Sequence, residues 1–160
     1  MNENTTWTIC HANARGTGSA LKLELHPANA NAGGYILAKI AKQKTVAAYN
    51  GGTPVFATFV WEHPIDAKLG VDELAQMLMV LRGYTESIED GKGVFHRTSE
   101  ANMVIKFCHM IEPRPGYMLS VSKKPFDGEL VDAFIVLRVP EAIVLSCALE
   151  QSFGKLVFGE

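Results

Sequence analysis

The sequence predicts an α+β fold in which several β-strands followed by one helix occur twice along the chain. Residues 5–69 contain short runs of alternating apolar and polar side chains, which are typical of half-buried strands. Residues 71–82 then show apolar side chains at helical spacing. The same order recurs, with strands expected over 93–138 and a helix over 140–153.

The chain length and composition favour one folded domain. A chain of 160 residues, 48% hydrophobic and 20% charged, is large enough to bury a core without disulfides or metals. We therefore expect a single domain over 1–160, with pseudo-repeat halves at 5–83 and 91–158. An acidic connector, 84–92, divides them.

The strands of the first half follow from alternation. In residues 21–26 three leucines alternate with polar side chains, and in 35–41 Tyr35 and Lys39 share a face. Two glycines in the turn 13–19 permit positive φ, and Pro64 requires a bulge or an edge. The strands expected in this half are 6–10, 21–26, 35–41, 55–61 and 65–69.

The first helix has recognisable ends. Asp72 is the expected N-cap and Gly83 occupies the C′ position. Its apolar side chains repeat at helical spacing, and they are Leu74, Met77, Leu78 and Leu81.

The second half repeats the pattern and ends in a very apolar helix. Its expected strands are 94–97, 103–111, 117–122 and 130–138. Pro140 suits the first helical position, and apolar side chains surround almost the whole circumference of residues 142–153. Since a small domain cannot cover such a helix on all sides, this pattern favours an oligomer interface over burial within the chain.

Cysteine usage and the start of the chain bear on location. Cys10, Cys108 and Cys147 have no paired spacing, so we expect reduced, buried thiols and a cytoplasmic protein. Residues 1–7 resemble neither a signal nor a transit peptide, and no apolar run approaches the ~20 residues of a membrane span.

The polar residues do not indicate catalysis. The five histidines show no ligand spacing with cysteines or carboxylates, and Cys10-His11 and Cys108-His109 are neighbours that point to opposite faces of a strand. No phosphate-binding glycine loop opens a helix. We expect a protein without enzymatic activity, catalytic residues, metal or cofactor.

Five short motifs occur in a fixed order. They are Arg15 to Leu21, Gly34 to Leu37, Val60-Trp61, Glu112-Pro113 through Val121, and the helix that starts at Pro140. In this order, over residues 14–158, they resemble the Whirly family of single-stranded-DNA-binding proteins. More distantly, the chain resembles the positive-cofactor-four coactivators and the mitochondrial guide-RNA-binding proteins. It departs from the family where Thr17-Gly18 replace the second lysine of the Lys-Gly-Lys-Ala-Ala-Leu signature.

The resemblance implies two packed antiparallel four-stranded β-sheets, each half followed by a helix. It also implies a homotetramer packed through helices 71–82 and 140–153, and binding of single strands across the sheets with little sequence preference. Transcription regulation, genome maintenance and DNA repair are the settings it implies.

Single-strand binding needs rings on which bases stack and cations that follow the phosphates. Tyrosines at strand starts and lysines on strands can supply both, although the formal net charge is −2. The candidate nucleic-acid-binding residues are Arg15, Lys22, Tyr35, Lys39, Lys106, Tyr117 and Lys123. Seven other rings are expected in the core, and they are Phe56, Phe59, Trp61, Phe95, Phe107, Phe126 and Phe134.

Two functions from different classes follow. The first is sequence-tolerant binding of single-stranded DNA, with RNA as the other candidate ligand. The second is a structural or protein-interaction module that keeps the fold without binding nucleic acid, which the net acidity and the altered signature allow. Basic side chains that line one groove would favour the first, and scattered ones the second.

Overall fold

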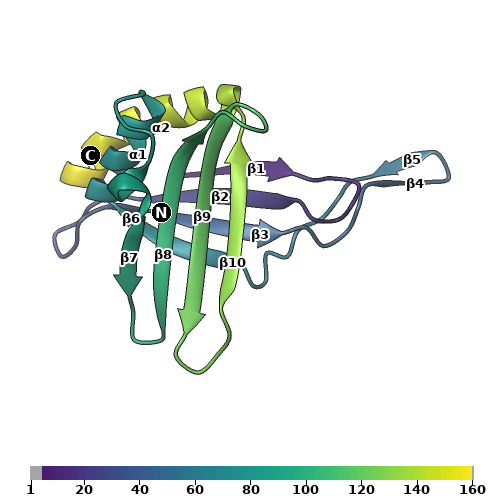
Figure 1. Cartoon of the computed structure of the whole chain (residues 1–160), viewed down its shortest axis with the longest axis horizontal. Helices are drawn as coiled ribbons and strands as arrows, with labels where there is room; N and C mark the ends of the chain where they lie inside the picture. Colours follow the sequence, from purple (N-terminus) through teal and green to yellow (C-terminus); the bar gives the residue numbers. More distant parts are fainter. Residues whose placement is uncertain (1–4, 160) are drawn as a thin grey trace.

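The computed structural model describes residues 5–159. Residues 1–4, part of the start for which no targeting segment is expected, and residue 160, the last of the expected 1–160 domain, lie outside the described residues. Two antiparallel four-stranded sheets form the body of the molecule (Figure 1). Sheet 1 has the order β1-β2-β3-β6, with bounds Thr5–His11, Ser19–His26, Tyr35–Lys42 and Ile65–Gly70. Sheet 2 has the order β10-β9-β8-β7, with bounds Val131–Leu137, Gly116–Pro125, Ala101–Met110 and Val94–Arg97.

A helix follows each sheet, as the sequence predicts. Helix α1 (Val71–Leu81) continues directly from β6, and α2 (Val139–Phe158) follows β10. A short 3-10 turn, η1 (Ile88–Gly91), lies in the connector between the halves. In Figure 1 the strands of one sheet run across those of the other, and both helices lie at one end. The expected α+β fold with two four-stranded sheets is confirmed.

The two sheets share one hydrophobic core. Alternation puts Leu21, Ile36 and Ile40 of sheet 1 on the same side, with Phe107 and Leu119 of sheet 2 facing them, and all five are buried. Each strand therefore keeps one face for solvent, and any ligand that binds a sheet must use that outer face or an edge.

Histidine–carboxylate contacts tie the halves together reciprocally. In the first half, the Nε2 of His11 at the end of β1 lies 2.9 Å from the carboxylate of Glu141 in the first turn of α2. In the second half, the Nε2 of His96 in β7 lies 2.7 Å from Glu73 in the first turn of α1. The first strand of each half thus holds the helix of the other half.

The helix ends differ in detail from expectation. Gly70, not Asp72, is the N-cap of α1, because β6 runs into the helix without a loop and leaves Asp72 in the first turn. Gly83, with φ of 78°, follows the C-cap Arg82 as predicted. Helix α2 begins at Val139 and continues to Phe158, five residues past the expected end, where Gly159 adopts positive φ.

The expected strand over 55–61 is wrong. Residues around the Gly51-Gly52 turn pair with each other instead, as β4 (Ala48–Asn50) and β5 (Thr53–Val55), and β5 ends before Phe56. Positive φ at both glycines closes this local hairpin, so residues 48–55 project from the body (Figure 1). From the rest of the expected strand, Phe59 forms one bridge, with Gln43 just beyond the end of β3, and the Val60 N–H donates to the Lys42 carbonyl oxygen at 2.8 Å.

The three cysteines and most of the seven rings are less buried than the sequence predicts. Cys10 and Cys147 are exposed and Cys108 is half-buried, because each lies on the side of its strand or helix that faces away from the core. Among the seven rings expected in the core, only Phe107 is fully buried. Four are exposed, and they are Phe56, Phe95, Phe126 and Phe134.

No helix in the part of the chain that the structure describes is long and apolar enough to cross a membrane.

Candidate nucleic-acid interface

The outer face of sheet 1 brings together three of the predicted residues. Lys22 and Lys39 lie opposite each other in neighbouring strands, and Tyr35 lies farther along β3 on the same face. All three are half-buried. This grouping follows from the sequence pattern, since alternation alone puts Tyr35 and Lys39 on one side.

The polar groups of this face are largely satisfied by their neighbours. The Lys39 ammonium donates to Glu24 across 2.7 Å, and this hydrogen bond is the largest cause that lowers the pKa of the Glu24 carboxyl. The Lys68 ammonium lies 4.2 Å from the centroid of the Tyr35 ring, which stacks on His26 at 4.5 Å. The Tyr35 ring is therefore covered on part of its surface before any base arrives.

Lys22 is engaged as well. Its ammonium lies 4.4 Å from the ring centroid of Trp61, a residue from the segment that follows β5. A cation over an aromatic face is stabilised by the ring quadrupole and is partly shielded from solvent. Phosphates that approach sheet 1 meet lysines that already have partners.

The outer face of sheet 2 has a different composition. Lys106, Ser120 and Phe134 form one row across β8, β9 and β10. In the adjacent row, Phe95 of β7 lies opposite Val104. Phe95 and Phe134 are 62% and 60% exposed, and Lys106 is exposed. Two open rings therefore flank a lysine on one side of the sheet.

Lys106 has no ion pair with any of residues 5–159. Gly93 allows the chain to pass close to its side chain, because a Cβ there would lie 2.7 Å from the Lys106 Cγ and 2.5 Å from the carbonyl oxygen of Ile105. Because Lys106 has no carboxylate partner within residues 5–159, its charge is available to a phosphate. The sequence predicts this lysine as a contact but assigns both neighbouring rings, Phe95 and Phe134, to the core.

Tyr117 and Lys123 lie on the opposite side of sheet 2 from Lys106. The Tyr117 ring packs beside Phe107, with centroids 6.1 Å apart, and beside His109, at 4.9 Å. The Lys123 ammonium lies 3.9 Å from Asp66 at the edge of sheet 1. The seven predicted residues therefore divide among several surfaces, and strand register, which alternation does not reveal, decides which of them meet.

Arg15 lies in the turn between β1 and β2, away from both outer faces. The Asn13 side chain shapes this turn, because its carbonyl oxygen accepts from the backbone N–H groups of Arg15 and Thr17, at 3.1 and 3.0 Å. Arg15 itself is exposed and has no ion pair within residues 5–159.

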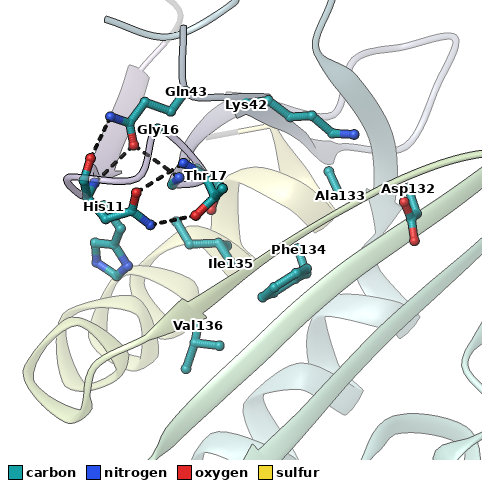
Figure 2. A pocket seen from close by; sticks show the side chains of 13 residues that line it. His11, Gly16, Thr17, Lys42, Gln43, Asp132, Ala133, Phe134, Ile135 and Val136 are labelled. Atoms are coloured by element: carbon teal, nitrogen blue, oxygen red, sulfur yellow. Dashed lines mark hydrogen bonds between the residues drawn. The ribbon is translucent and has the colours of Figure 1, made fainter. Parts of the chain in front are cut away.

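A groove of about 660 Å³ lies between this turn and β10, the edge strand of sheet 2 (Figure 2). Lys42 and Gln43 line one side, and Asp132 and Phe134 of β10 line the other. Phe134 thus belongs both to the outer face of sheet 2 and to the groove. Sequence reasoning missed this groove because it depends on contact between the halves.

A set of three or more histidine, cysteine or carboxylate side chains close enough to hold a metal ion does not occur among the described residues.

Neither a protein-family model nor a curated protein sequence matches the chain. Solved structures, however, are similar to it over almost its whole length. WHY1 from Arabidopsis thaliana has a TM-score of 0.69 at 17% identity, covering 96% of this chain and 87% of that one. The plant transcriptional regulator PBF-2 has a TM-score of 0.69 at 17% identity, covering 98% and 84%. MRP1/MRP2 from Trypanosoma brucei has a TM-score of 0.65 at 17% identity, covering 96% and 86%. The fold of this chain is therefore the Whirly-like fold, which confirms the resemblance inferred from the ordered motifs.

Proposed function

We propose that the protein binds single-stranded DNA, with little sequence preference, in transcription regulation or genome maintenance such as DNA repair. The observation that carries the proposal is the outer face of sheet 2, where exposed Phe95 and Phe134 flank Lys106, which has no ion pair within residues 5–159. Every base has a flat face that can stack on such rings, and a lysine follows the phosphates without reading sequence. The similarity to a plant transcriptional regulator supports the setting.

Under this proposal the predicted residues contact the DNA at different places. Lys106 contacts phosphates on sheet 2, Lys22, Tyr35 and Lys39 offer a weaker contact on sheet 1, and Arg15 reaches the strand from its turn. Tyr117 and Lys123, which lie near the two ends of β9 on the inner side of sheet 2, contribute only where the DNA strand passes an end of the sheet. RNA is the other candidate ligand, because stacking and phosphate contacts do not require deoxyribose.

Fluorescence anisotropy with a labelled oligonucleotide of mixed sequence tests the proposal. Binding should weaken as salt increases, since bound cations release counterions from the strand. Phe95→Ala with Phe134→Ala should weaken it about 10- to 100-fold, and Tyr84→Ala, at a still more exposed ring outside both sheets, should leave it unchanged. No binding at low salt, or an affinity independent of salt, would sink the proposal.

A homotetramer through helices 71–82 and 140–153 is part of the proposal. The exposed side of α2 carries Ile143 at 62%, Val144 at 51% and Phe158 at 79% exposure, and Met79 of α1 is 43% exposed. Exposed apolar side chains on two neighbouring helices favour contact with another copy, because their contact with water is unfavourable. Light scattering should give four times the chain mass, and Ile143→Glu with Val144→Glu should lower it. A wild-type monomer would contradict the assembly.

The alternative is a structural or protein-interaction module without nucleic-acid binding. Two observations favour it. The predicted cations are divided among the β1–β2 turn, sheet 1 and both sides of sheet 2 instead of lining one groove. On sheet 1, Lys39 and Lys68 already contact Glu24 and Tyr35. The same titration decides between the two functions. The cytoplasmic location stays a prediction, which imaging of the tagged protein would check.

A further inference from the structure

The segment over residues 45–61 is here named the arm, and every residue from 45 to 56 in it is exposed. It contains no charged residue, since the nearest ones are Lys44 and Glu62. Its tip is the β4–β5 hairpin, which projects away from the sheets on the side opposite the helices (Figure 1). Tyr49 and Phe56 are 80% and 79% exposed there. A two-stranded hairpin with open rings is only marginally stable in water, which indicates a contact partner.

The root of the arm is fixed to the turn that carries Arg15. The side-chain amide of Gln43, which is 8% exposed, holds the two together through hydrogen bonds of both its oxygen and its nitrogen. Its Oε1 accepts from the backbone N–H groups of Asn13 and Gly18, at 2.9 and 3.0 Å. Its Nε2 donates to the carbonyl oxygens of Asn13 and Thr45, at 2.9 and 3.0 Å. The arm and the turn are therefore positioned as one unit.

The root is also stabilised across its own two strands. Thr45 and Thr58 share a side-chain hydrogen bond of 2.8 Å, and the backbone N–H of Lys44 donates to the carbonyl oxygen of Thr58 at 2.7 Å. These bonds define where the arm leaves the body, so its rings project from a fixed base.

Cations surround this root. Arg15 and Lys42 are exposed and have no ion pair with any of residues 5–159, whereas Lys44 lies 3.6 Å from the exposed carboxylate of Glu62. Lys42 also lines the groove beside β10, with Asp132 as the one carboxylate there. Open rings on the arm and cations at its root supply the two groups that a single-stranded nucleic acid requires, with bases on the rings and phosphates on the cations.

We propose that the arm, with Arg15 and Lys42 at its root, is a second contact for the single strand, distinct from the outer face of sheet 2. This inference rests on the proposed function. Charge complementarity selects nucleic acid over a second copy of the chain, because Arg15 and Lys42 at the root of the arm have no ion pair within residues 5–159 and suit phosphates, not an apolar interface. The arm also points away from the helices through which copies are proposed to assemble.

The test is the anisotropy titration on the full chain, with Tyr49→Ala and Phe56→Ala combined. We expect affinity to fall about tenfold for each ring while the salt dependence stays the same, because rings release no counterions. Arg15→Ala with Lys42→Ala should instead lower the slope of log affinity against log salt by about 0.7 for each cation. Tyr84→Ala, 74% exposed just after the end of α1, is the matched control.

The outcomes separate the two proposals. If the wild type does not bind, the proposed function and this inference both fail. If the wild type binds and the double ring variant binds equally well, only the arm inference is overturned. A double variant whose mass by light scattering falls while its affinity is unchanged would show that the arm contacts another copy, which also overturns it. Unchanged thermal unfolding confirms that the variant is folded.

Discussion

Sheet 1 and sheet 2 each turn one face to solvent, and the two faces are built from different side chains. On sheet 1, Lys39 is bonded to Glu24 and Lys68 lies over Tyr35. On sheet 2, Lys106 has no ion pair within residues 5–159, and Phe95 and Phe134 are open. The same strand-and-helix unit therefore gives one face that satisfies itself and one that offers its groups to a ligand.

The two faces show that a residue type can be present on a surface without being available to a ligand. A ligand that binds sheet 1 must first break contacts that the folded chain already makes, and the free energy of those contacts is subtracted from binding. A ligand on sheet 2 displaces mainly water. Similar numbers of rings and lysines can thus bind a single strand with different affinity.

The largest effect is expected from truncating a ring on the inner side of sheet 2. Phe107→Ala should lower the free energy of unfolding by about 3–5 kcal/mol, because Phe107 is fully buried and leaves a cavity. Phe95→Ala in the same sheet should change it by less than about 0.5 kcal/mol. Urea unfolding of both variants measures the difference. Equal destabilisation would show that Phe95 is a core residue and would remove it from the binding surface.

A smaller effect should separate the lysines of the two sheets. Lys106→Ala is expected to weaken single-strand binding several-fold and to lower the slope of log affinity against log salt by about 0.7. Lys39→Ala should change both less, since its charge is already compensated by Glu24. Neither variant should lower the melting temperature by more than a few degrees. A greater loss for Lys39→Ala would reverse the roles given to the two faces.

The smallest effects concern Glu24. Glu24→Gln should tighten binding slightly, because it removes a negative charge and frees Lys39. The pKa of Glu24 is lowered in the folded chain, so its contribution to stability is present above its unfolded pKa and is lost as pH falls through the lowered value. Melting temperatures of wild type and variant should therefore converge in acid. A difference that grows as pH falls would contradict this sign.

Much of the fold could be predicted from the sequence because its signals are local. Alternation in 21–26 and 35–41 identified two strands and their outer faces, and Gly83 marked the end of the first helix. The strand expected over 55–61 is wrong because the Gly51-Gly52 turn pairs 53–55 with 48–50, and beyond Val55 the described residues of that segment form a single bridge, Phe59 to Gln43. Hydrophobic side chains there satisfied the strand pattern without being buried, since pattern does not reveal what covers a segment.

The candidate site was less predictable, because it depends on pairs of strands. The sequence alone determined that Lys39 shares a face with Tyr35, and that Lys106 and Phe107 point to opposite sides, since side chains alternate along any strand. Only the tertiary structure decided that Tyr117 joins Phe107 while Phe134 joins Lys106, because cross-strand neighbours are fixed by register. It also decided which rings are covered, since burial depends on the opposing sheet and not on the residue's own neighbours in the chain.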